Sequence, residues 1–125
     1  MSQPEPMSRY AMRRLKADTD EKVRMDKVNQ IVKTTYEYAI SQAKSYISTS
    51  YEQNVSERAD ANFVLSNMTD ILKGLQELFP GCLVMKKRIV KAQDGKMYDM
   101  AFMDEKVLPF VNQSHSRDYI VIDWT

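Results

Sequence analysis

The sequence predicts an α+β domain in which an N-terminal helical hairpin packs on a small antiparallel sheet of about three strands. Apolar residues recur at helical spacing as far as Phe79, and after Gly81 the pattern changes to the alternation that is typical of strands. The dipeptide Asp94-Gly95 is a strong signal for a β-hairpin turn. A helical layer over one face of a sheet is the economical way to enclose a single core with these elements.

The first helix is expected from Asp18 to about Ser50. Asp18 and Glu21 have the spacing of a capping box, which satisfies two main-chain donors at a helix start. The positions that follow advance by three or four residues and therefore share one helix face: Val28, Val32, Tyr36, Ala39, Ala43, Tyr46 and Ser50.

The second helix is expected from about Ser56 to Phe79, capped by Asn54 or by Ser56 itself. Pro80-Gly81 ends it, because proline disfavours helix at the preceding residue and glycine permits a chain reversal. The polar link 51–55 is short, so we expect the two helices to run antiparallel. The apolar face of this helix is the cleanest in the chain: Ala61, Val64, Leu65, Met68, Ile71, Leu72, Leu75, Leu78 and Phe79.

Strands are expected at residues 82–92, directly after Asp94-Gly95, and at residues 119–124. A two-residue turn pairs Ala92 with Met97 and Ile89 with Met100. The polar run 112–118 is expected to be a loop before the last strand. The expected inward residues are Leu83, Met85, Ile89, Tyr98, Met100, Phe102, Ile120, Ile122 and Trp124, and the expected outward residues are Lys86, Arg88 and Asp99.

The chain has 125 residues, which favours a single domain, expected at 18–125, after a basic flexible arm at 1–17. The arm has four basic residues against Glu5, a net charge of +3, while residues 51–80 have a net charge of −3. A short helical turn at 8–16 is not expected to be stable alone. The chain has no apolar run of about 20 residues and no secretory signal, so an intracellular location in cytoplasm or nucleus is expected.

The residue types that carry chemistry are scarce. One cysteine, Cys82, excludes an internal disulfide, and one histidine, His115, excludes most two-histidine metal sites. His115 stands beside Ser114, Ser116 and Asp118, but the residues of known serine–histidine–aspartate triads come from separate elements. The sequence therefore predicts no catalytic residue, no metal and no cofactor.

The length of the first helix bears on function. About 31 residues span roughly 46 Å, whereas a compact 125-residue domain has a diameter of roughly 36 Å. Either the helix breaks near residues 32–35, or part of its apolar face is covered by another protein, for which a second copy of the chain is a candidate. We expect that contact to use Tyr36, Tyr38, Tyr46 and Tyr51, since tyrosine is favoured at interfaces; the alternative places Tyr36 and Tyr46 in the core.

The basic residues suggest two electrostatic contacts. Arg9, Arg13 and Arg14 are expected to clamp onto an acidic protein surface or onto phosphates. Lys86 and Arg88 lie in a basic hairpin patch that extends to Lys91, for which a solvated sheet face is the favoured interpretation.

Three segments of the C-terminal half also resemble a known group of proteins. They are Leu78-Phe79-Pro80-Gly81-Cys82-Leu83-Val84, the Asp94-Gly95-Lys96 hairpin, and the ending from Asp118 to Thr125. Together they resemble small uncharacterised proteins of nucleocytoplasmic large DNA viruses, over residues 70–125. The resemblance implies a virion-associated or host-interacting protein and implies no catalytic residues.

Taken together, these observations predict a non-enzymatic structural or protein-interaction module that self-associates. The alternative is an accessory protein that binds nucleic acid through the basic arm and the 86–91 patch. A membrane partner is not expected.

Overall fold

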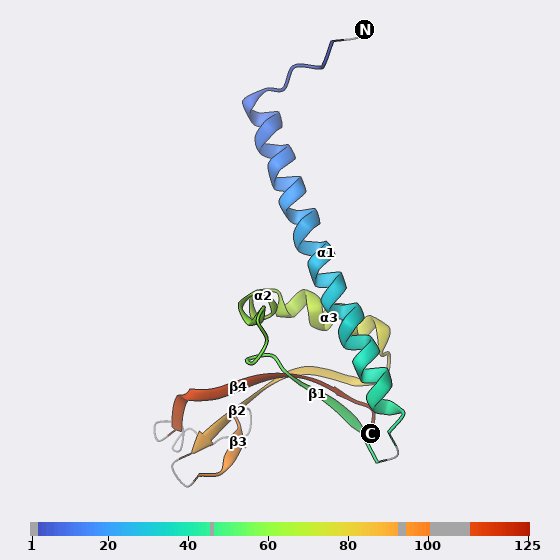
Figure 1. Cartoon of the computed structure of the whole chain (residues 1–125), viewed down its shortest axis with the longest axis vertical. Helices are drawn as coiled ribbons and strands as arrows, with labels where there is room; N and C mark the ends of the chain where they lie inside the picture. Colours follow the sequence, from blue (N-terminus) through green and yellow to red (C-terminus); the bar gives the residue numbers. More distant parts are fainter. Residues whose placement is uncertain (1–2, 46, 93–94, 101–110) are drawn as a thin grey trace.

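The computed structural model describes residues 3–45, 47–92, 95–100 and 111–125, without the side chains of residues 92 and 111–115. The chain is an α+β protein: one long N-terminal helix and two short helices pack on a four-stranded antiparallel sheet (Figure 1). The helices are α1 (Arg9–Ala43), α2 (Ala61–Ser66) and α3 (Met68–Leu78). The strands are β1 (Ser50–Asn54), β2 (Leu83–Ala92), β3 (Met97–Asp99) and β4 (Val111–Asp123), in the spatial order β1-β4-β2-β3.

The long helix begins nine residues before the predicted start. Ser8 is its N-cap, and the Ser8 side chain accepts a hydrogen bond from the Ala11 amide at 3.0 Å. Asp18 lies inside α1, so the predicted capping box is wrong, and residues 9–17 of the expected arm are helical. Residues 9–17 contain no glycine or proline, and extending an existing helix through such residues costs little.

The predicted helical hairpin is also wrong, because the polar link between its helices is strand β1. β1 pairs with β4: Ser50 lies opposite Asp123 at one end, and Asn54 lies opposite Tyr119 at the other. The sheet therefore has four strands and not the expected three. The predicted second helix is interrupted at Asn67, whose side-chain amide donates to the Phe63 carbonyl at 2.9 Å. A side chain that competes for a main-chain acceptor in this way favours a helix end.

The last strand is longer than predicted and includes the polar run 112–118. β4 pairs with β2 along its length: Leu83 lies opposite Asp123 at one end, and Ala92 lies opposite Val111 at the other. The pairing is irregular between Ile89 and Lys91. Pairing with β2 satisfies main-chain groups of this run whatever its side chains, so polar composition did not prevent the strand from forming. Cys82 lies half-buried against the core just before β2.

The hairpin register differs from the predicted one by a single residue: Lys91, and not Ala92, pairs with Met97. In β2 the predicted faces are reversed, because Val84 and Lys86 pair with the buried Ile122 and Ile120 on the helix-covered face. Leu83, predicted inward, is 55% exposed. A shift of one residue in a strand moves every side chain to the other face, so the shifted register and the reversed faces have the same physical basis. Phe102 lies outside the described residues.

One core lies between the helices and the sheet. The fully buried Ile120 and Ile122 of β4, with Trp124 packed beside them, confirm the inward side predicted for the last strand. All three helices lie on this side of the sheet (Figure 1). The buried apolar residues of the helices are Val28, Ile31, Val32 and Ala39 of α1, Val64 of α2, and Met68, Ile71 and Leu75 of α3.

Candidate interaction surface

The N-terminal part of α1 extends away from the rest of the molecule (Figure 1). The helix has 35 residues and is therefore about 52 Å long. Its C-terminal part packs against α3 and β1, whereas residues 9–23 are exposed apart from the half-buried Ala11. We call residues 9–23 the overhang. The prediction that the helix is too long for its own domain holds, but the uncovered part is at the N-terminal end.

The overhang has large apolar side chains that contact nothing in the core. Met12 is 52% exposed, Leu15 53% and Val23 61%. A helix turns by about 100° per residue, so these three side chains lie within roughly 80° of one another. We call them the outer stripe. Thr19 lies on the same side, and its hydroxyl donates to the Leu15 carbonyl at 2.8 Å, so it needs no further partner.

The outer stripe and the core face lie on opposite sides of α1. By the same rotation, the buried residues of α1 are centred roughly 170° away from Met12, Leu15 and Val23. No tilt of the helix can therefore bring the outer stripe onto the protein's own core. The buried residues are Val28, Ile31, Val32, Thr35 and Ala39.

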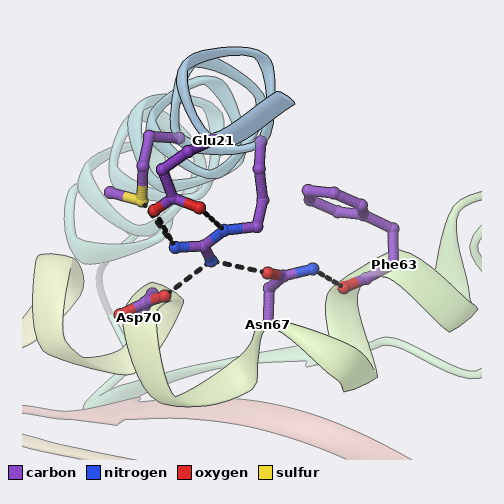
Figure 2. A network of polar contacts seen from close by, with 6 residues as sticks. Glu21, Phe63, Asn67 and Asp70 are labelled. Carbon is purple, nitrogen blue, oxygen red and sulfur yellow. Dashed lines mark hydrogen bonds and ion pairs between the residues drawn. The ribbon is translucent and has the colours of Figure 1, made fainter. Parts of the chain in front are cut away.

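Arg24 joins α1 to Asn67 and Asp70 at the point where the overhang begins. Figure 2 shows Glu21, Asn67 and Asp70 around this contact. The Nη1 atom of Arg24 donates to Asn67 Oδ1 at 2.8 Å and to Asp70 Oδ2 at 2.7 Å. Its Nε and Nη2 atoms donate to the two carboxylate oxygens of Glu21 at 2.9 and 2.7 Å. We call Arg24, Glu21, Asn67 and Asp70 the Arg24 cluster; it joins α1 to the interruption between α2 and α3.

The charges of the Arg24 cluster stabilise one another. The hydrogen bonds from Arg24 lower the pKa of the Glu21 carboxyl below its ordinary value of 4.5. Hydrogen bonds to Glu21 and Asp70 in turn raise the pKa of the Arg24 guanidinium. The two-pronged Arg24–Glu21 contact fixes the orientation of both side chains as well as their charge. Sequence reasoning missed this cluster, because Asn67 and Asp70 approach Arg24 only after folding.

The basic residues of the predicted arm lie on the overhang. Arg9, Arg13 and Arg14 are exposed, and within the part of the chain that the structure describes they make no salt bridge. Lys16 contacts Asp20 at 2.6 Å in the same helix. The overhang thus has four positive charges at 9–16, followed by Asp18, Asp20 and Glu21 at 18–21.

The other predicted basic residues, Lys86 and Arg88, lie on β2, far from the overhang (Figure 1). Their side-chain nitrogens are 3.8 and 3.3 Å from Oδ1 of Asp118 on the neighbouring strand. Asp118 is nearly buried, so it offsets part of the charge of this patch directly. The two basic groups therefore do not form one surface.

The predicted tyrosines are likewise dispersed. Tyr36 is half-buried and packs on Phe79, with ring centroids 5.3 Å apart. Tyr38 is 55% exposed on α1. Tyr51 lies on β1, accepts a hydrogen bond from Gln53 Nε2 at 3.2 Å, and has a pKa raised by burial. Tyr46 lies outside the described residues.

The residues considered for catalysis are in or beside β4. Asp118 contacts Lys86 and Arg88, and its amide donates to Ser56 Oγ at 2.9 Å. The main chain of His115 lies in β4, and its side chain is outside the described set. Among the described residues no group of three or more histidine, cysteine, aspartate or glutamate side chains is arranged to hold a metal ion.

No helix in the described parts of the chain is long and apolar enough to cross a membrane. No protein-family model matches the chain, and no curated protein or solved structure is significantly similar to it.

Proposed function

We propose that the protein is a non-enzymatic interaction module that self-associates through the overhang of α1. One observation carries this proposal: Met12, Leu15 and Val23 are exposed on a helix that leaves its own domain, on the side opposite the core. Apolar side chains grouped in this way mark contact sites when they are not needed for folding. The resemblance of residues 70–125 to proteins of large DNA viruses supports a virion as the setting for such an assembly.

A second candidate is supported by Arg9, Arg13 and Arg14, which are exposed and without an ion-pair partner among the described residues. An exposed basic helix binds phosphate backbones, and such binding weakens steeply as salt rises. The neighbouring Asp18, Asp20 and Glu21 oppose this function, because they would face the same phosphates. The 86–91 patch contributes little to it, since Asp118 contacts Lys86 and Arg88.

Light scattering on the whole chain, with absorbance read for nucleic acid, distinguishes the two. We expect a species larger than one chain that is free of nucleic acid and persists between about 50 mM and about 500 mM salt, because salt does not weaken apolar burial. A species that contains nucleic acid and loses it at the higher salt would support the second candidate. A strict monomer at high concentration, without nucleic acid, would contradict both.

A further inference from the structure

We propose that the partner of the overhang is the overhang of a second copy of the chain, lying antiparallel to it. This inference rests on the proposed self-association and adds the contact surface and its orientation. The two-fold axis is placed between Lys16 and Ala17 of the two copies. The outer stripe of each copy then forms the seam, with Met12 of one chain lying between Thr19 and Val23 of the other.

The length of the overhang supports this arrangement. With the axis between Lys16 and Ala17, Arg9 of one copy lies beside Arg24 of the other, since their positions are equally far from the axis. Arg24 is where α1 joins its own domain through Asn67 and Asp70. The two helices therefore overlap along the whole of both overhangs and stop at the edge of each domain.

The helix face on which the partner lies also supports antiparallel pairing of the two overhangs. The partner lies on the outer stripe, which is opposite the face that packs on α3 and β1. It therefore meets no part of the domain that α1 already contacts. An antiparallel arrangement also places the two domains at opposite ends of the helix pair, so that they do not compete for space.

Charge decides between antiparallel and parallel pairing. Arg13, Lys16 and Asp20 lie on one side of the outer stripe, seven or fewer residues apart. In the antiparallel pair Arg13 faces Asp20 of the second copy, and this contact occurs twice by symmetry. In a parallel pair the basic segment 9–16 of one copy lies beside the same segment of the other, and the acidic segment 18–21 also meets itself. Such like-charge contacts disfavour parallel pairing.

The test is disulfide formation between single cysteines in the full-length chain with Cys82 replaced by serine. Two cysteines can join only when their Cα atoms are within about 7 Å. Lys16→Cys lies next to the proposed axis and is expected to form a linked dimer on mild oxidation. Arg9→Cys lies on the same side of the helix but roughly 22 Å from its equivalent in the antiparallel pair, so it is expected not to link.

Ala17→Cys is the matched control. It is also next to the axis, but it points to the back of the helix, away from the seam, and is expected not to link. Met12→Cys tests for parallel pairing: within the outer stripe, it faces its equivalent in a parallel pair, whereas the two lie roughly 14 Å apart in the antiparallel pair. Linking of Met12→Cys would overturn the inference and leave the proposed function standing. An unlinked dimer with every cysteine variant, Met12→Cys included, would overturn the overhang as the contact. A monomer by light scattering would overturn both the inference and the proposed function.

Discussion

The two halves of α1 belong to one unbroken helix and yet have different physical roles. From Arg24 onward its apolar residues face α3 and the sheet, and Val28 and Ala39 are 1% exposed. In the overhang Met12, Leu15 and Val23 are on the other side, and Val23 is 61% exposed. The comparison teaches that helix formation and burial are separate: the overhang is helical because it continues a packed helix, and its side chains remain available to another molecule.

The largest expected effect is on the free energy of unfolding, which should depend on the packed half of α1 and not on the overhang. Ile71→Ala removes a fully buried side chain against α1 and is expected to lower the free energy of unfolding by about 2–5 kcal/mol. Leu15→Ala in the overhang is expected to change it by less than about 0.5 kcal/mol. Urea unfolding at a concentration where the chain is monomeric measures both. Similar losses in the two variants would mean that the overhang packs on its own domain.

A second variant tests how closely the packed half approaches α3. A Cβ atom added to Gly74 would lie 3.0 Å from Cγ2 of Val32, with no room for a longer side chain. Gly74→Leu is expected to destabilise the chain by about 1–3 kcal/mol, and adding Val32→Ala should restore part of that loss. Urea unfolding of the single and double variants checks this. An unchanged stability in Gly74→Leu would contradict the described contact between α1 and α3.

The boundary between the two halves is tested at Arg24. Arg24→Ala removes the contacts to Glu21, Asn67 and Asp70, and is expected to lower the protection of main-chain amides around residues 21–27 in hydrogen exchange. Lys16→Ala is the matched control, because it removes an exposed ion pair within the overhang only. Equal effects around residues 21–27 in both variants would show that the Arg24 cluster does not fix the boundary.

The same boundary should depend on pH. The pKa of Glu21 is lowered in the folded chain, so its contact with Arg24 stabilises the fold above the ordinary value of 4.5. The stabilisation is lost as the pH falls below 4.5 and through the lowered pKa. Amide protection around residues 21–27 is therefore expected to decrease in that acidic range, and to decrease less in Glu21→Gln, whose side chain does not ionise. Identical pH profiles would contradict the assigned ion pair.

The smallest expected effect is at the tip of the overhang. Ser8→Ala removes the cap of α1 and is expected to cost about 0.5–1 kcal/mol of local helix stability. Because the overhang is outside the core, the midpoint of urea unfolding should not move. The amide signal of Ala11 should report fraying in nuclear magnetic resonance spectra. Ser41→Ala, on the same helix but away from the cap, should leave that signal unchanged.

The features that sequence predicted well are those encoded locally. The inward Ile120 and Ile122, the end of the last helix before Pro80, and the hairpin near Gly95 all follow from short patterns. Strand β1 could not be predicted in the same way, because its polar residues form a strand only by pairing with β4, about 70 residues later. The break at Asn67 depends on one side-chain hydrogen bond.

The candidate site was predicted only in part. Helix length indicated an uncovered segment, but tyrosine content pointed to the packed half, where Tyr36 lies against Phe79. The signal that would have located the overhang was present: no glycine or proline follows Pro6 before Gly74, and Ser8 is as good a cap as Asp18. A local pattern does not choose between two such caps, since the choice depends on how far the packed helix extends.

The most direct test of the central claim compares two lysine substitutions by sedimentation equilibrium. Leu15→Lys places a charge in the outer stripe, and Ala17→Lys places the same charge two residues away on the back of the overhang. We predict that Ala17→Lys associates like the unmodified chain, whereas Leu15→Lys has the mass of a single chain at the same concentration. Association of Leu15→Lys equal to that of Ala17→Lys would contradict the account.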